Sequence, residues 1–182
     1  MDKDPDARLV RASRNGDRVA YETLLMRYER PVYNVAMRML KDPEDARDVV
    51  QVVFIRVFER LQQFNFEHRF YSWLYRIAIN ECIDHLNSRN RTRPLEDEDM
   101  PSDGDTPQEA CDRSQRGAAL QEAMMQLAPD YRAVIVLRHF VDRSYREMAE
   151  ILGVPEKTVK SRLFTARQML RDALEARGIG RE

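Results

Sequence analysis

Apolar side chains recur every three or four residues along most of this chain, which is the spacing of amphipathic α-helices. Up to residue 93 the pattern predicts four helices, over residues 6–16, 18–40, 42–64 and about 70–88. Gly16 is a candidate C-cap, and Asp17 and Asp42 are candidate N-caps. Pro43 stands at the first position of the third helix, followed by two acidic residues that suit a first turn. Pro31, inside the second helix, predicts a kink or a break there.

The helical pattern stops at residues 94–112 and then resumes. This segment holds three prolines, one glycine and no apolar stripe, so we predict an extended, mostly disordered acidic linker. Beyond it, helices are predicted over residues 114–127, 130–141 and 144–170. The chain has only six glycines and few strand-like alternations. We therefore expect an all-α protein with two small helical domains, residues 1–93 and 113–182.

The most specific local pattern is the pair of helices within residues 144–170, joined by a tight turn. Gly153 stands where the chain must turn sharply, and Pro155 is well placed to open the second helix. The buried face of the first helix is expected to include Met148, Ala149 and Leu152. The inward stripe of the second is expected to be Val159, Leu163 and Ala166. This arrangement predicts a helix-turn-helix.

The outward face of the second helix would carry polar, basic and aromatic side chains near its N-terminus, namely Glu156, Lys157, Lys160, Ser161 and Phe164. In helix-turn-helix proteins this end of the helix enters the major groove. Arg162, Arg167 and Arg171 are near enough to contact phosphates. A helical hairpin with a solvated basic face is the alternative interpretation.

Six of the fifteen aromatic residues fall between residues 64 and 75, in the stretch FNFEHRFYSWLY. On a helical wheel Phe70 and Leu74 lie on the core side, with Tyr71 at its flank. Trp73 instead heads a polar ridge formed with Arg76, Asn80 and Asp84. Such a ridge suits nucleic acid, because tryptophan stacks on a base while amide and carboxylate groups read base edges. The alternative is a partly buried tryptophan that covers the edge of the domain.

Composition and charge place the chain among soluble proteins. Hydrophobic residues make up 43% and charged residues 34% of the sequence, which allows both a core and a solvated surface. The longest apolar runs fall far short of the roughly 18 residues of a membrane span, and the N-terminus lacks a signal-like apolar region. We therefore expect a cytoplasmic protein with no membrane insertion of its own. The formal charge of −1 conceals a segment of −8 at residues 94–112 between flanks of +3 and +4.

Enzymatic and metal chemistry find little support in the sequence. No phosphate-binding loop and no nucleophile with a neighbouring base can be seen, so we expect no catalysis and no cofactor. Cys82 and His85 are three residues apart on one helix, but two ligands are too few for a structural zinc site. The two cysteines, Cys82 and Cys111, provide no disulfide framework.

Taken in order, these motifs resemble those of an extracytoplasmic-function (group 4) sigma factor of bacterial RNA polymerase. The stretch YERPVYNVAMRML resembles sigma region 2.1, and DPEDARDVVQVVFIRVFERLQQF resembles region 2.2. HRFYSWLYRIAINECIDHL resembles regions 2.3 and 2.4, and residues 114–175 resemble region 4. The resemblance implies an alternative sigma factor that binds core polymerase, recognises the minus-35 and minus-10 promoter elements and promotes promoter melting.

The resemblance also implies roles for individual residues. The polymerase β′ clamp helices would contact Asp48, Gln51, Val52 and Ile55, although the family usually has Glu at the position of Val52. The minus-10 element, including a flipped-out base, would meet Phe64, His68, Arg69, Trp73, Arg76, Asn80 and Asp84. The minus-35 element would meet Glu156, Lys157, Lys160, Ser161, Arg162, Phe164 and Arg167. Many relatives carry Arg at the position of Thr165.

The implied partners are core RNA polymerase, through its β′ clamp helices and β flap, promoter DNA, and an anti-sigma factor that is commonly membrane-anchored. The acidic linker would run through the basic polymerase cleft, where its carboxylates could mimic RNA. Two other functions stay open. A stand-alone helix-turn-helix regulator leaves the aromatic stretch unexplained, and a helical adaptor would bind proteins but not DNA.

Overall fold

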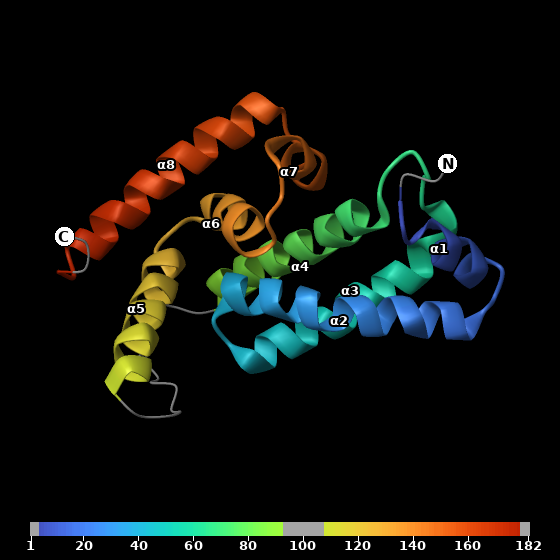
Figure 1. The fold of residues 1–182 in the computed structure, drawn as a ribbon, viewed down its shortest axis with the longest axis horizontal. Coiled ribbons are helices and arrows are strands. Elements are labelled where there is room, and N and C mark those ends of the chain that lie inside the picture. Colours follow the sequence, from blue (N-terminus) through green and yellow to red (C-terminus); the bar gives the residue numbers. More distant parts are fainter. Residues whose placement is uncertain (1–3, 93–107, 179–182) are drawn as a thin grey trace.

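The computed structural model of the chain describes residues 4–92 and 108–178, and within these ranges all regular structure is helical, as expected (Figure 1). Helices α1 to α4 form one group and α5 to α8 form another. Helix α4 lies between them, packed on one side against α2 and α3 and on the other against α6 and α7.

The first group contains α1 (Ala7–Arg14), α2 (Arg18–Leu40), α3 (Pro43–Arg60) and α4 (Phe70–Thr92). The expected caps are present: Asp17 accepts a hydrogen bond from the Ala20 amide at 3.1 Å, and Asp42 accepts from the first amides of α3 at 2.8 and 3.1 Å. Gly16 has a φ of +90°, which glycine adopts without strain. The sequence predicted a kink or a break at Pro31; helix α2 continues through Pro31, so it does not break there.

The end of the third helix differs from the prediction, which extended it to residue 64. Helix α3 ends at Arg60 and a single 3₁₀ turn, η1 (Leu61–Gln63), follows. Phe64 then has an extended backbone, with φ −61° and ψ 126°, and its ring is buried. Burial of Leu61 and Phe64 ends the helix, because both side chains turn back into the core.

The second group contains α5 (Gln108–Met125), α6 (Pro129–Ile135), the π-helical turn η2 (Val136–Phe140), α7 (Tyr145–Leu152) and α8 (Glu156–Glu175). Helix α5 begins at Gln108, inside the segment predicted as linker. The sequence there consists of residues that tolerate a helix, with no proline or glycine. The rest of the predicted linker, residues 94–107, lies outside the described residues.

The helix-turn-helix forms as predicted from α7 and α8. Ser144 and Glu147 form a reciprocal capping box at the start of α7, and Gly153 ends that helix with a φ of +65°. The predicted inward stripe of α8 is buried throughout. One detail of α7 differs: Ile151 is fully buried, while Ala149 and Leu152 only pack against the edge of the core.

The cores of the two groups are continuous, and Arg132 on α6 lies where they meet. Its guanidinium donates to the main-chain carbonyls of Met124, Met125 and Leu127 at the end of α5, and to the carbonyl of Met39 in α2. These carbonyls lie at helix ends, where main-chain acceptors lack helical partners. Burial lowers the pKa of Arg132, and the four carbonyls compensate its charge.

Candidate nucleic-acid interface

An aromatic cluster stands at the N-terminal end of α4. The ring centroid of Phe64 lies 5.2 Å from that of Phe66, 5.9 Å from that of Phe70 and 5.3 Å from that of Trp73. Phe64 is only 3% exposed. In this structure the ring is part of the core and packs against Trp73, and its contact with a flipped base stays a prediction.

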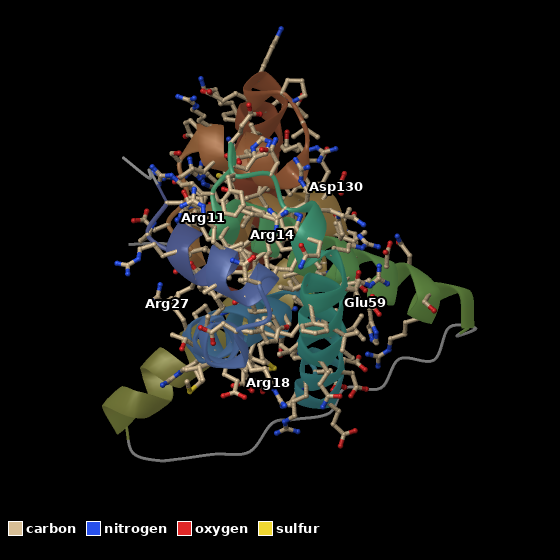
Figure 2. All side chains as sticks on the ribbon, turned by 90° about the vertical axis from the view of Figure 1, so that its right-hand side faces the viewer. Arg11, Arg14, Arg18, Arg27, Glu59 and Asp130 are labelled. Atoms are coloured by element: carbon tan, nitrogen blue, oxygen red, sulfur yellow. The ribbon has the colours of Figure 1, made fainter. Side chains whose placement is uncertain are left out.

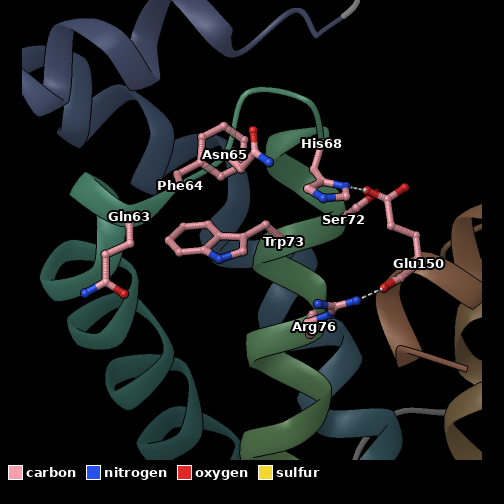
Figure 3. A pocket seen from close by; sticks show the side chains of 8 residues that line it. All are labelled: Gln63, Phe64, Asn65, His68, Ser72, Trp73, Arg76 and Glu150. Atoms are coloured by element: carbon pink, nitrogen blue, oxygen red, sulfur yellow. Dashed lines mark hydrogen bonds and ion pairs between the residues drawn. The ribbon is translucent and has the colours of Figure 1, made fainter.

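The sequence left two interpretations of Trp73 open, a residue that faces nucleic acid and a partly buried residue at the domain edge, and its position is compatible with both. Its ring packs against Phe64 and, at 5.9 Å between centroids, against Phe70, yet it remains partly exposed. Phe70, Tyr71 and Leu74 are buried as the helical wheel predicts. Beside the indole is a pocket of about 130 Å³, lined by Gln63, Phe64, Asn65, His68, Ser72, Trp73, Arg76 and Glu150 (Figure 3).

Three residues that are predicted to contact DNA near this pocket instead contact residues of α7. His68 Nδ1 lies 2.9 Å from a carboxylate oxygen of Glu150, and Arg76 donates to the carbonyls of Glu150 and Ile151 (Figure 3). Arg69 lies 3.9 Å from the carboxylate of Glu147. The first turns of α7 therefore place two carboxylates against the basic groups at the head of α4.

Glu147 stays ionised at neutral pH. Partial burial opposes its ionisation, but hydrogen bonds from Tyr71 and from Ser144 outweigh that effect and lower the pKa to about 2. Arg143 also lies against Tyr71, with its guanidinium 4.3 Å from the ring centroid. The contact between α4 and α7 is thus both ionic and aromatic.

Asn80 and Asp84 lie farther along α4, exposed on its surface and outside the residues that line the pocket. Between them, Glu81 is buried and pairs with Arg56 of α3 at 2.9 Å. The ridge predicted by the helical wheel therefore exists, but only Trp73 and Arg76 border the pocket.

Two basic residues near the aromatic cluster were missed in the sequence. Arg11 and Arg14 of α1 place their guanidinium groups 4.8 and 5.4 Å from the ring centroid of Phe66, and Figure 2 shows both on the side of α1 that faces this loop. Arg14 also donates to the carbonyl of Phe64 at 3.4 Å. No local pattern reveals these contacts, because about fifty residues separate the partners.

The outer face of α8 is exposed as predicted. Glu156, Lys157, Lys160, Ser161 and Phe164 are all exposed, and 66% of Phe164 is accessible. Lys160 pairs with Glu156 at 2.8 Å along the helix. Of the three arginines predicted to reach phosphates, Arg162 pairs with Asp130 at 2.8 Å. Arg167 is exposed and lies 3.3 Å from His139, and Arg171 is also exposed.

Helix α3 presents a third face, which is exposed and partly apolar. The predicted contacts Asp48, Gln51, Val52 and Ile55 all lie on its surface. Phe58, which is 66% exposed, continues this face one turn beyond Ile55 and is not among the residues predicted from the sequence. Exposed apolar strips of this kind mark protein–protein contacts.

Metal and membrane chemistry receive no positive support. Cys82 is buried, which raises the pKa of its thiol to about 12, and His85 instead lies 3.2 Å from Asp45. Across residues 4–92 and 108–178 no group of three His, Cys, Asp or Glu side chains could hold a metal ion. In the same part of the chain, no helix is both long enough and apolar enough to span a bilayer.

The fold and its three faces define a two-domain helical protein in which a helix-turn-helix is joined to an aromatic pocket with basic residues and to an exposed, partly apolar face of α3. The sequence matches the Sigma-70 region 2 family over residues 24–92 and the Sigma-70, region 4 family over residues 117–170. The chain belongs to the extracytoplasmic-function sigma factors of the sigma-70 family, and is an alternative sigma factor of RNA polymerase.

Relatives of known name span nearly the whole chain. The RNA polymerase sigma-H factor of Pseudomonas aeruginosa is 32% identical, covering 96% of both chains. The ECF RNA polymerase sigma-E factor of Haemophilus influenzae is 33% identical, covering 93% of this chain and 95% of its own. Among solved structures, CnrH in complex with the cytosolic domain of CnrY is similar with a TM-score of 0.73 and 26% identity, over 95% of this chain and 99% of that one.

Proposed function

We propose that each of the three faces has its own role in transcription initiation. Helix α3 docks on core polymerase, the pocket at the head of α4 holds unpaired minus-10 DNA, and α8 reads the minus-35 element. The observation that carries this proposal is the exposed apolar strip of α3 in the same domain as the aromatic pocket. A regulator that acts on DNA alone has no need for the strip, and a protein-only adaptor has no need for the pocket.

At the minus-10 element, Trp73 stacks on an unpaired base while neighbouring polar and basic groups meet its backbone and edges. Stacking on an aromatic side chain stabilises each unpaired base by about 1–3 kcal/mol, which offsets the cost of unstacking. The residues assigned to this surface are His68, Arg69, Trp73, Arg76, Asn80 and Asp84, with Arg11 and Arg14 adding positive charge. Since α7 occupies His68 and Arg76, DNA can bind there only after the two domains separate.

At the minus-35 element, the N-terminal half of α8 enters the major groove. Ser161 and Phe164 lie at its exposed face with Glu156, while Lys157 and Lys160 provide positive charge. Arg167 meets the phosphate backbone, and Arg162 does so once it leaves Asp130. The outer face of α8 is exposed in this structure, in which α7 packs against α4. The minus-35 element is therefore read without separation of the two domains.

A second polymerase contact fits the groove between α5, η2 and α8. This groove of about 480 Å³ is lined by apolar side chains and by basic ones at its edge, including Leu120, Ile135, Phe140, Leu170, Leu174, Arg167 and Arg171. An amphipathic helix fits such a groove through its apolar face, and we assign it to the β flap. The domains extend over residues 1–93 and 113–182, with the acidic segment between them in the polymerase cleft.

The chain acts without covalent chemistry of its own and works in the cytoplasm. Control by an anti-sigma factor is supported by the structural similarity to CnrH, which was solved with the cytosolic domain of CnrY. Such a partner would stabilise one arrangement of the two domains and hold the chain inactive, whether free or at the inner membrane.

The α3 assignment is tested by binding to purified core polymerase. Ile55→Glu should weaken binding at least tenfold, because it places a charge in an apolar contact. Met26→Glu, on the exposed surface of α2, is the matched control and should bind as the wild type does. If Ile55→Glu binds core polymerase normally, α3 is not the docking face. If the wild-type chain does not bind core polymerase but footprints DNA tightly, the protein is a stand-alone regulator.

A further inference from the structure

Ser72 carries a buried hydroxyl group that has no hydrogen-bond partner. The residue is 2% exposed, and its Oγ is one of two buried side-chain nitrogen or oxygen atoms without a partner among the described residues. Buried polar side chains nearly always find a partner, and leaving one unpaired destabilises the fold. An unpaired hydroxyl in a native core therefore requires an explanation.

The usual solution is available to helical serines and threonines in this chain. Ser13 donates to the carbonyl of Leu9 at 2.7 Å, and Thr23 donates to the carbonyl of Val19 at 2.7 Å. Both bonds run to the residue four positions earlier, as is common for hydroxyl groups in helices. Ser72 is in the first turn of α4 and does not form this bond.

The position of Ser72 suggests what its hydroxyl serves. Ser72 lines the pocket beside Trp73, together with Phe64, Asn65 and His68 (Figure 3). The side-chain amide of Asn65 donates to the Glu67 carboxylate at 3.1 Å and accepts from the Glu67 main-chain amide at 2.9 Å. The ring of His68 is hydrogen-bonded to the Glu150 carboxylate. Within the described chain, Ser72 is the pocket-lining residue whose side chain is buried, polar and without a hydrogen-bond partner.

We propose that Ser72 is a specificity-determining residue of the pocket, and that its hydroxyl hydrogen-bonds the edge of the unpaired base that Trp73 stacks on. This inference rests on the proposed minus-10 role of the pocket. A hydroxyl both donates and accepts, so it supports a base whose edge completes the bond. A base without a matching group leaves the hydroxyl buried and unpaired, and is rejected.

The proposal predicts opposite effects on stability and on selectivity. Ser72→Ala removes an unpaired buried hydroxyl, so the free protein should unfold at the same or a higher urea concentration than the wild type. The same change should reduce discrimination at one base position of the minus-10 element by about five- to tenfold. Ser13→Ala, the control, removes a hydroxyl that has a protein partner and should leave discrimination unchanged.

The experiment uses the full chain with core polymerase and a panel of promoter fragments that vary each non-template base of the minus-10 element. Open-complex formation is scored by permanganate reactivity of unpaired thymines. Relaxed selectivity at a single position, with unchanged or increased stability, is the expected result. If Ser72→Ala keeps the wild-type base preference, or unfolds at clearly lower urea, the inference is overturned. If the wild-type chain forms no open complex on any fragment, the proposed function fails instead.

Discussion

Replacing Trp73 separates its structural role from its proposed role in melting. The indole packs against Phe64 and Phe70, with ring centroids 5.3 and 5.9 Å away. Each aromatic contact of this kind contributes about 0.5–1.5 kcal/mol beyond simple burial. Trp73→Ala should therefore lower the free energy of unfolding by at least about 1–3 kcal/mol. Stacking on one base contributes a further 1–3 kcal/mol or so to the open complex alone.

The stacking contribution corresponds to a loss of about five- to 150-fold in the equilibrium for promoter opening. Closed binding should change little, because no residue of α3 or α8 lines the pocket beside the indole. The assay compares closed complexes, trapped at low temperature and measured by gel shift, with open complexes, measured by permanganate reactivity. Trp73→Phe keeps an aromatic ring and should fall between the wild type and the alanine variant in both stability and opening.

Equal losses of closed and open complexes in Trp73→Ala would refute this reasoning. Such a result would mean that the indole only supports the fold, as the partly buried interpretation holds. Urea unfolding of the same variants identifies any loss that comes from a smaller folded fraction. Closed and open complexes are compared at urea concentrations below the one at which Trp73→Ala begins to unfold.

Three further predictions concern the domain contact, the minus-35 face and the core. Glu147→Gln together with Glu150→Gln should raise the affinity of the free chain for a degenerate single-stranded DNA 12-mer about tenfold, because both carboxylate contacts with the head of α4 are lost. Fluorescence anisotropy measures this affinity, and no gain would mean that α7 does not compete with DNA. Lys160→Ala, if Lys160 meets phosphate, should weaken minus-35 binding across sequences and reduce the salt slope by about one, whereas a change at one base position would make it a base contact. Arg132→Met should lower the free energy of unfolding by about 3 kcal/mol in urea, since four carbonyls lose their donor; exposed Arg171→Met should change it by less than about 0.5 kcal/mol.

Much of this architecture follows from local patterns. The caps at Asp17 and Asp42, the turn at Gly153 and the buried stripe of α8 depend on residues a few positions apart, so helical periodicity is enough to place them. The exposed faces of α8 and α3 follow from the same stripes, because what faces inward fixes what faces outward.

Contacts between distant segments could not be predicted in this way. The pattern placed Phe64 at the end of the third predicted helix, and only the early end of α3 and the packing against Phe70 bury its ring. Arg14 reaches the same loop from α1, and Glu150 reaches His68 across 82 residues of sequence. The burial of the Ser72 hydroxyl and its place in the pocket wall likewise depend on segments distant in sequence, which no local pattern shows.

Promoter-specific transcription with purified core polymerase tests the central claim most directly. The template is a promoter found by mapping transcript 5′ ends after overexpression of the chain in its host. Core polymerase alone should give no specific transcript, and adding the chain should produce one that starts at the mapped position. A chain that binds the fragment but yields no specific start would contradict the account.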